Sequence, residues 1–518
     1  MLARGSHDNF TKNLQVNHVE VNGKTLIDYW GYNPVSFFAP NTSYAAEIEY
    51  NREGTELKEL IRALNQNGIE CFLDVVFYHT AEGNKQGPCF SFKGFDNNIY
   101  YMLTPNGYYY NYSGCGNTLN CNHPIVRQLI LDCLRYWTTA YHVDGFRFDL
   151  ASILGRNEDG MPMEQPPLLQ SLACDPILGD VKLIAEAWDA GGLYQVGSFP
   201  SWSRWAEWNG RYRDDLRNFL KGDYGMADTA ICRITGSRDL YDPAIRGNNA
   251  SVNFLNCHDG FTLWDMYSYN WKHNEANGWA GQDGSDDNRS WNCGIEGETD
   301  NLDVLALRHK LAKNAMAVLL MSRGTPMFLS GDEFLNTQYG NNNAYCQDNE
   351  ISWTNWHLDK GRKELLAFVS KLIHLRLDHP VLHRRRFFTG REPGDDSNMI
   401  PQVEWFDHTG SIMDMDDWQN THAFSMMIYL NGSDIPEVDW YGNRMVDNDF
   451  ILIFNAHYEP IMFTLPDERY GRKWQLVVDT HNPNEPALSY EAGFMITAQS
   501  RSFLMLMSAK KPKKPMGL

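Results

Sequence analysis

The sequence predicts an α/β protein with a (β/α)8 TIM barrel over residues 1–385 and a C-terminal all-β sandwich over residues 386–518. Short apolar runs alternate with longer stretches of helical spacing through the first region, which is typical of parallel βαβ units. The length of this region and its number of strands favour a closed eight-stranded barrel over an open sheet. Beyond residue 385 helical spacing ends, and short strands separated by Asp, Asn, Gly and Pro indicate a second domain.

The first predicted elements are two strands and a helix. Residues 14–21 alternate between polar and apolar side chains, which predicts a strand, and a shorter strand is expected over residues 35–40. Residues 55–67 form the first predicted helix, because leucines and Ile61 recur there at helical spacing and Gly68 can cap the C-terminus.

The later elements follow the same logic. Strands of the barrel are predicted over residues 69–77, 143–149, 181–186, 251–259 and 325–331. Helices are predicted over residues 124–141, 166–173, 211–221, 304–321 and 364–377. The second domain should contain strands over residues 450–454, 461–465, 474–478 and 503–507. A segment rich in Gly, Asn, Asp and Trp, residues 270–298, is expected to be a long surface loop.

Composition and charge exclude several classes of partner. The net charge of −20 argues against nucleic acids and anionic membranes, whose phosphates would be repelled. A membrane span is not expected either, since no apolar run reaches about 18 residues. A neutral polymer such as a glycan is compatible with this charge, and 16 Trp and 26 Tyr supply rings that can stack on sugars, although most aromatic residues belong to cores.

The cysteines indicate a reduced compartment. All ten are scattered and no Cys-x-x-Cys occurs, which disfavours a zinc site. The first ten residues lack the apolar core of a signal peptide. We therefore expect a cytoplasmic protein, or a plastid protein if the source is a photosynthetic eukaryote, and we leave a homo-oligomer open.

The strand over residues 143–149 ends in Arg147 and Asp149, two positions apart and hence on the same side of a strand. Charged side chains at the end of a buried strand are costly unless they pair with each other or take part in chemistry. For this strand alone, an internal salt bridge and a catalytic pair are both open.

Three further predicted strands also end in polar residues. Together the four strand ends carry Asp74 and His79, Arg147 and Asp149, Glu186, and His258 and Asp259. A single strand-end aspartate is often only a helix N-cap. In a parallel barrel, however, the C-terminal ends of the strands meet at one mouth, where active sites lie. A metal site is the competing explanation, but oxygen-rich metal sites rarely include an arginine.

Paired carboxylates are what glycoside cleavage needs, one as nucleophile and one as proton donor. Asp149, beside Arg147, should stay ionised as a nucleophile must. Glu186 has apolar neighbours, which suit an acid that has to keep its proton. Asp259 and His258 suit the binding of sugar hydroxyls.

Motifs at these positions resemble those of a known superfamily. The four ordered motifs of the α-amylase superfamily (glycoside hydrolase family 13) are similar to DVVFYH at residues 74–79, HVDGFRFD at 142–149, LIAEAWD at 183–189 and NFLNCHD at 253–259. More narrowly, isoamylase-type glycogen and starch debranching enzymes are similar to DYWGY at 28–32, SGCGNTLN at 113–120, WDAGGLY at 188–194, HNEANG at 273–278 and GNNNAYC at 340–346.

The resemblance implies hydrolysis of α-1,6-glucosidic branch linkages in glycogen, amylopectin or their limit dextrins by a retaining double displacement. By motif position it implies that Asp149 is the nucleophile, Glu186 the general acid/base and Asp259 the transition-state stabiliser. Further substrate contacts are expected from Tyr32, Asp74, His79, Arg147, Trp188, His258, Trp291 and Asp348.

Among these, Tyr32 is expected to be a stacking platform. Trp291 and Asp348 are included because segments 270–298 and 340–348 follow barrel strands and should rim the mouth of the barrel.

The chain departs from the family in two respects. The family usually has Asn before the first motif's histidine, where Tyr78 stands here; that Asn serves calcium in many α-amylases. The family also carries an N-terminal glycan-binding β-sandwich, which is not expected here because the first predicted strand already begins at residue 14. We expect no metal and no cofactor.

Two alternatives to a debranching hydrolase remain. The four superfamily motifs are shared with α-1,4-acting amylases and transglycosylases. Some isoamylase relatives are non-catalytic glucan-binding subunits, although the presence of Asp149, Glu186 and Asp259 argues against that role. In each case the expected partner is a branched α-glucan, with no nucleic acid and no membrane.

Calcium dependence tests the interpretation of Tyr78. A phenol offers a single oxygen and is a poor ligand for an ion that takes six to eight. Glucan hydrolysis should therefore continue at an unchanged rate after treatment with EGTA. Complete loss of hydrolysis on chelation, restored by added calcium, would contradict this prediction.

Overall fold

The computed structural model describes residues 19–21, 23–41, 44–46, 52–389, 400–418, 424–484 and 488–508. The chain divides into two compact units, each of which is described by itself. The first unit comprises Met1–Trp208, Glu275–Ala280 and Ala344–Ser352. The second comprises Asn209–Asn274, Gly281–Asn343 and Trp353–Leu518.

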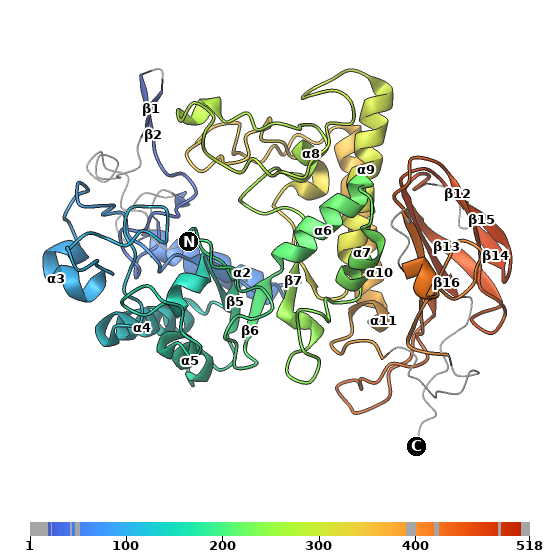
Figure 1. The fold of residues 1–518 in the computed structure, drawn as a ribbon, viewed down its shortest axis with the longest axis horizontal. Helices are drawn as coiled ribbons and strands as arrows, with labels where there is room; N and C mark the ends of the chain where they lie inside the picture. The colour runs from blue at the N-terminus through green and yellow to red at the C-terminus, as the bar shows by residue number, and fades with distance from the viewer. Residues whose placement is uncertain are drawn as a thin grey trace. The chain divides into compact units, whose positions relative to one another are not determined.

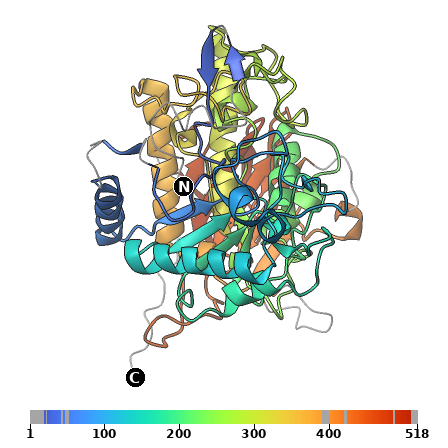
Figure 2. The ribbon, with the colours of Figure 1, turned by 90° about the vertical axis from the view of Figure 1, so that its left-hand side faces the viewer.

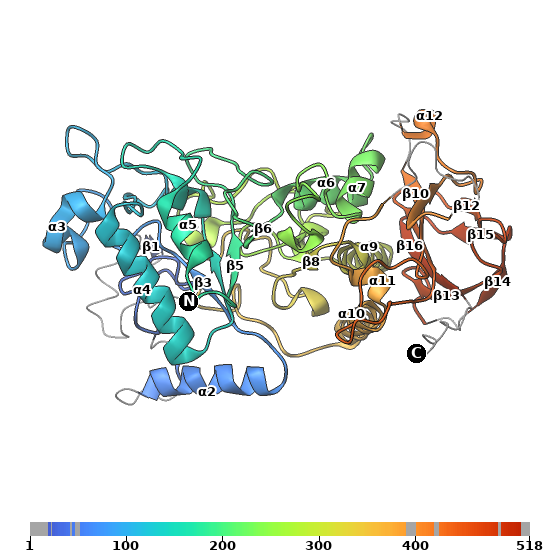
Figure 3. The ribbon, with the colours of Figure 1, turned by 90° about the horizontal axis from the view of Figure 1, so that it is seen from below.

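The first unit is built on four parallel strands, β3 (Phe72–Val75), β4 (Gly145–Phe148), β5 (Lys182–Ala185) and β6 (Trp205–Trp208). Its other elements are β1 (Val19–Val21), β2 (Lys24–Leu26), α2 (Arg52–Gln66), α3 (Phe92–Tyr100), α4 (Pro124–Tyr141), the 3-10 turns η2 (Ala151–Gly155) and η4 (Glu275–Asn277), and α5 (Pro167–Cys174). Figure 3 shows α4 and α5 side by side along the strands, and Figure 2 shows α4 running lengthwise across this unit.

Helix α4 illustrates how local sequence determines where β4 begins. Pro124 occupies the first turn and the His123 side chain accepts a hydrogen bond from the Ile125 amide, so the N-terminus is capped. One face of the helix, including Trp137, is buried. His142 ends the helix in the left-handed conformation (φ 57°). The chain thus reverses directly into β4, in which every residue is buried.

The second unit contains the parallel pair β7 (Ser251–Asn253) and β8 (Thr325–Pro326). Its helical elements are α6 (Gly210–Lys221), α7 (Ala227–Ile234), η3 (Asn248–Ala250), α8 (Leu263–Met266), α9 (Leu302–Met321), η5 (Asp332–Phe334), α10 (Lys360–Asp378), α11 (Pro380–His383) and α12 (Met415–Trp418). Its antiparallel strands are β9 (Val403–Phe406), β10 (Ser425–Leu430), β11 (Phe450–Asn455), β12 (Ile461–Thr464), β13 (Lys473–Asp479), β14 (Ser489–Glu491), β15 (Met495–Ala498) and β16 (Ser502–Ser508).

These antiparallel strands form two sheets, drawn in orange and red in Figure 1. The larger has the order β14-β13-β16-β11-β10-β9, and the smaller pairs β12 with β15. Strand β11 is buried at every position because its two faces meet different cores. Phe450, Leu452 and Phe454 join a cluster that includes helical residues of α9 and α10, whereas Ile451 and Ile453 pack with β12 and β15. An unbroken apolar run is the expected sequence of such a strand.

The predicted helices and most predicted strands are confirmed, so the protein has a parallel sheet and antiparallel C-terminal sheets as expected. The closed eight-stranded barrel and the domain boundary at residue 385 stay predictions. The strand predicted over residues 35–40 is wrong: this stretch consists of bends around a single bridge residue, Ser36. The Phe37 carbonyl accepts hydrogen bonds from Cys133 Sγ (3.0 Å) and Trp137 Nε1 (2.9 Å) instead of from a strand.

Six strands are not predicted from the sequence, namely β2, β6, β9, β10, β14 and β15. Of the strand predicted over residues 14–21, only β1 lies within the described residues. All ten cysteines are free thiols. In the part of the chain that the structure describes, no helix is both long and apolar enough to cross a membrane.

Asp332, in the second unit, should make stability depend on pH. Its Oδ1 accepts the Leu263 amide at 2.8 Å, and burial raises its pKa from an ordinary 3.8 to about 8. Between these values the folded state holds a proton that the unfolded state has lost. The protonated Asp332 side chain therefore stabilises the folded state fully below pH 3.8, and this stabilisation is lost as the pH rises to about 8.

Asp332→Asn keeps an acceptor for the Leu263 amide but cannot ionise. The free energy of unfolding of this variant should fall less between pH 5 and pH 8 than that of the wild type, by about 4 kcal/mol. Urea denaturation at the two pH values measures the difference. Identical slopes for the two proteins would contradict the prediction.

Candidate active site

The candidate active site is organised around the Arg147 guanidinium at the C-terminal end of β4. In register with Arg147 on the neighbouring strand is Asp74 of β3. The guanidinium contacts three carboxylates, from β3, from the residue after β4 and from the residue after β5. Its Nη1 lies 2.9 Å from Asp74 Oδ1 and 2.6 Å from Asp149 Oδ1, and its Nη2 lies 3.0 Å from Glu186 Oε1.

These charges are removed from water. Arg147, Asp149 and Glu186 are 5%, 5% and 1% exposed. Burial lowers the pKa of Arg147, but the charges of Asp74, Glu186 and Asp149 outweigh it and hold this pKa well above its ordinary value. The Trp208 ring covers the guanidinium, with Cζ 3.7 Å from the ring centroid. Arg147 is therefore a permanent cation that joins the carboxylates.

Asp149 and Glu186 are also held by groups other than Arg147. The Tyr78 hydroxyl donates to Asp149 Oδ2 at 2.6 Å. The Leu150 amide donates to Glu186 Oε2 at 2.7 Å, and Leu150 adopts the left-handed conformation (φ 41°). One carboxylate oxygen of Asp149 lies within 4.8 Å of one of Glu186. The backbone directly after Asp149 thus orients the Glu186 carboxylate.

Two predicted binding residues stand beside this pair. The Tyr32 hydroxyl donates to Asp74 Oδ2 at 2.6 Å. His79 is completely buried, and neither ring nitrogen has a hydrogen-bond partner among the residues that the structure describes. Burial lowers the pKa of His79 from 6.5 to about 4, although the charge of Asp149 opposes this change. His79 therefore presents a neutral imidazole, suited to a sugar hydroxyl.

The two short segments of the first unit that are remote in sequence pack together. Tyr345 O accepts hydrogen bonds from the amides of Tyr29 (2.7 Å) and Trp30 (3.1 Å), close in sequence to Tyr32. Trp279 Nε1 donates to the Tyr345 hydroxyl at 3.0 Å. Asp348 belongs to the same segment and is exposed. Parts of both predicted rim segments therefore lie in the unit that holds Asp149 and Glu186.

Trp188 also lies in the first unit, three residues after the end of β5 and two residues from Glu186. Its ring stacks on that of Tyr194 with centroids 5.9 Å apart and an interplanar angle of 10°. Tyr194 is 43% exposed. A stacked pair of this kind suits contact with a sugar ring.

Three predicted site residues belong to the second unit. His258 and Asp259 follow β7, with His258 Nε2 3.7 Å from Asp259 Oδ1. Trp291 packs against the core of this unit, and the Arg501 guanidinium lies 4.6 Å from its ring centroid. The substrate contacts assigned to these residues stay predictions.

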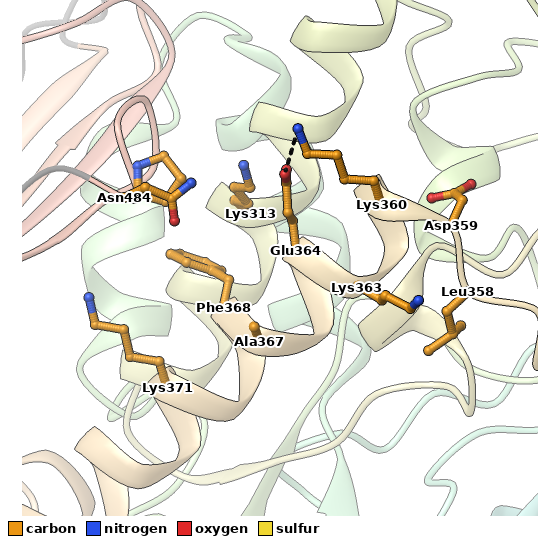
Figure 4. Close-up of a pocket in the computed structure, with 11 residues that line it drawn as sticks. Lys313, Leu358, Asp359, Lys360, Lys363, Glu364, Ala367, Phe368, Lys371 and Asn484 are labelled. Carbon is orange, nitrogen blue, oxygen red and sulfur yellow. Dashed lines mark ion pairs between the residues drawn. The ribbon is translucent and has the colours of Figure 1, made fainter.

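The second unit also contains a cavity of about 630 Å³ (Figure 4). It is lined by Lys313 of α9, by residues 358–371 in and before α10, and by Pro483 and Asn484. Asp359 accepts the Arg362 amide at the start of α10, and Glu364 pairs with Lys360 at 3.8 Å. Both carboxylates thus have local structural partners, and the cavity lacks a catalytic pair.

Comparison with known proteins decides the family. A family model described as "Isoamylase, C-terminal" matches residues 402–495. The glycogen operon protein GlgX homolog of Mycobacterium tuberculosis (strain ATCC 25618 / H37Rv) is 45% identical over 485 residues, which cover 93% of this chain and 67% of that protein. The chain belongs to the isoamylase-type debranching enzymes of the α-amylase superfamily.

A plant relative is similar in sequence, and two solved structures are similar in fold. Isoamylase 3, chloroplastic, of Oryza sativa subsp. japonica is 45% identical, with 89% of this chain and 56% of that protein covered. The pullulanase from Bacillus acidopullulyticus has the same fold, with a TM-score of 0.67, 24% identity, and 92% of this chain and 51% of that chain covered. A type I pullulanase from Bacillus subtilis str. 168, solved with maltose, gives a TM-score of 0.67 at 24% identity, with 93% and 59% covered. The chain thus spans between half and two thirds of the length of these proteins.

Three contacts of the candidate site are not predicted from the sequence. The sequence identifies Tyr78 only as a poor calcium ligand, although its place between Asp74 and His79 indicates a position in the site. The Leu150 contact comes from a backbone amide, which no side-chain pattern reveals. Trp208 lies in β6, whose four residues are too few to show a period.

The protonation of His79 can be measured directly. In spectra of protein labelled with 15N-histidine, its ring should stay neutral from pH 8 to about pH 5, because its pKa lies near 4. The unfolded state takes up a proton on His79 near pH 6.5, whereas the folded state does so only near pH 4. The stabilisation from the buried neutral imidazole is therefore present above pH 6.5 and is lost as the pH decreases toward 4. His79→Gln identifies the signal. A His79 signal that titrates near pH 6.5 would contradict the structure.

Proposed function

We propose that this protein hydrolyses α-1,6-glucosidic branch linkages in glycogen, amylopectin or their limit dextrins, with retention of configuration. The observation that carries the proposal is the buried pair of Asp149 and Glu186, whose nearest oxygens lie within 4.8 Å and which share the Arg147 guanidinium. Retaining glycosidases hold their two carboxyl groups about 5–5.5 Å apart, close enough for one to attack the sugar directly. Family membership supports the choice of α-1,6 linkages.

The roles are assigned by motif position, and the environment of each carboxylate is compatible with them. Asp149 accepts hydrogen bonds from Arg147 and Tyr78, both of which favour its charged form, as a nucleophile requires. Glu186 is the more deeply buried and first protonates the bridging O6, then removes a proton from the incoming water. Asp259, by its position in the fourth motif, stabilises the oxocarbenium-like transition state.

Substrate binding is proposed for the groups around this pair. Tyr32 and the Trp188–Tyr194 stack supply aromatic faces, and the neutral His79 supplies a hydrogen bond to a hydroxyl. Asp74, Arg147, His258, Trp291 and Asp348 complete the proposed set.

We also propose that β3 to β8 belong to an eight-stranded barrel and that residues 386–518 form a separate domain, which the likeness to pullulanases supports. The free thiols are compatible with the proposed cytoplasmic or plastid location.

The linkage is tested by product analysis. The protein is incubated in parallel with β-limit dextrin, amylopectin and linear amylose, and the released chains are sized. Debranching should release linear chains from the first two substrates and leave amylose intact. Shortening of amylose would instead favour an α-1,4-acting enzyme, and binding to all three without products would favour a glucan-binding subunit.

Substitution of the two carboxylates should separate their roles. Asp149→Ala should lower the hydrolysis rate by about 1,000-fold or more while glucan binding persists. Glu186→Gln should do the same for ordinary glucans, yet a glycosyl fluoride, whose leaving group needs no proton, should accumulate as an adduct on Asp149, detectable by mass spectrometry. Asp144→Asn, which alters a carboxylate that accepts the Cys71 amide, is the control.

The stereochemistry provides an independent check. Proton NMR during the first turnovers should show the new reducing ends as the α-anomer, because two inversions at the anomeric carbon restore its configuration. A β-anomer as the first product, or an Asp149→Ala protein that debranches at nearly the wild-type rate, would refute the mechanism.

A further inference from the structure

Tyr78 contacts Asp149 from another segment of the chain. Its hydroxyl donates to Asp149 Oδ2 at 2.6 Å, while Arg147 Nη1 donates to Oδ1 at 2.6 Å. The two oxygens of this carboxylate thus each accept from a different donor, one a cation and the other a neutral phenol. A carboxylate with a donor on each oxygen has its plane and direction determined.

The Tyr78 ring is held firmly by its surroundings. The residue is 4% exposed and packs in a cluster with Val76 and Ile153, against which Leu150 is also packed. Its ring centroid lies 4.7 Å from that of His79. The Tyr78 carbonyl accepts the Leu119 amide at 2.8 Å, which anchors the backbone. The phenol therefore cannot turn away from Asp149 without disturbing this packing.

The phenol also remains a donor at every working pH. Burial, and next the charge of Asp149, raise the pKa of Tyr78 well above its ordinary 10.0. The other charged or titratable groups of this unit near Asp149 are Arg147, Asp74, Glu186, Tyr32, His79 and Cys115. Of these, Arg147 donates to Asp149. Tyr78 is thus the second donor that holds this carboxylate.

We propose that Tyr78 is a positioning residue that aims the Asp149 carboxylate at the sugar and stabilises the same carboxylate when it departs. This inference rests on the proposed retaining mechanism. In the first step a bond forms between Asp149 and the anomeric carbon while the bond to O6 breaks, and Glu186 gives its proton to O6. In the second step water attacks the anomeric carbon, the ester bond breaks with its electrons returning to Asp149, and the water proton passes to Glu186. The Tyr78 hydroxyl keeps its own proton throughout.

The two steps should differ in their dependence on Tyr78. A hydrogen bond to the charged carboxylate stabilises Asp149 before attack and again as it leaves, so its removal favours the uncharged ester. The second step therefore gains more from the phenol than the first. In addition, the hydrogen bond favours the ionised form of Asp149 in the free enzyme.

The test is Tyr78→Phe, which keeps the ring and its packing but removes the hydroxyl. On a branched glucan, kcat should fall by about 10- to 100-fold, the worth of one hydrogen bond to a charged group. The acidic limb of the kcat/KM profile should move to higher pH. With a glycosyl fluoride, the steady-state amount of adduct on Asp149 should rise relative to wild type.

Tyr101→Phe is a matched control in the same unit. It removes another buried phenol, one that donates to Glu82 and bonds Thr80 Oγ1 at 2.7 Å, neither of which belongs to the site. This variant can lower the melting temperature but should leave the acidic limb and the adduct level unchanged. If both variants shift the acidic limb equally, Tyr78 has only a structural role and the inference is overturned.

A second variant tests the inference even if Tyr78→Phe misfolds. Replacing Tyr78 by 3,5-difluorotyrosine keeps the shape of the ring and makes the phenol a more acidic, stronger donor. The acidic limb should then move to lower pH, opposite to the effect of Tyr78→Phe. If the wild type debranches and neither Tyr78 variant alters the acidic limb or the amount of adduct, the role of Tyr78 is refuted while the proposed function stands. If the wild type neither debranches nor forms an adduct, the proposed function itself fails.

Discussion

The site depends on one buried cation that is shared by three carboxylates. Arg147 brings Asp74, Asp149 and Glu186 to the C-terminal ends of three adjacent strands, where the carboxylates alone would repel one another. Leaving such charges buried without a partner costs about 3–5 kcal/mol. The guanidinium therefore serves folding as well as chemistry, because without it the buried carboxylates of Asp149 and Glu186 would lack their shared cation.

The backbone supports this arrangement as closely as the side chains do. The strand hydrogen bonds continue past the ends of β3 and β4: the Asp149 amide donates to Val75 O at 3.1 Å, and the Glu186 amide donates to Phe148 O at 3.0 Å. Leu150 then turns into the left-handed region and directs its amide at Glu186. The separation of the two carboxylates is consequently set by β-sheet geometry rather than by flexible side chains.

Helices were predictable because their signals are local. The ends of α4 match the predicted residues 124–141, since Pro124 marks the start and the apolar strand that begins at Val143 limits the end. Short strands were not: β6, β9, β14 and β15 have three or four residues each, too few to show a period of two. The stretch at residues 35–40 looked like a strand but bonds to side chains of α4, a partner that only tertiary structure supplies.

By itself the sequence determined the alternation of strands and helices, the residues at the strand ends and, through its motifs, the family. These features depend on the order of residues along the chain, and parallel strands must bring their ends to one edge of a sheet. Only the tertiary structure decided which atoms meet: that Arg147 reaches three carboxylates, that a backbone amide orients Glu186, and that Tyr78 contacts Asp149. Such contacts join segments up to 73 residues apart, as between Asp74 and Arg147. Their distances follow from packing, which residue order alone does not specify.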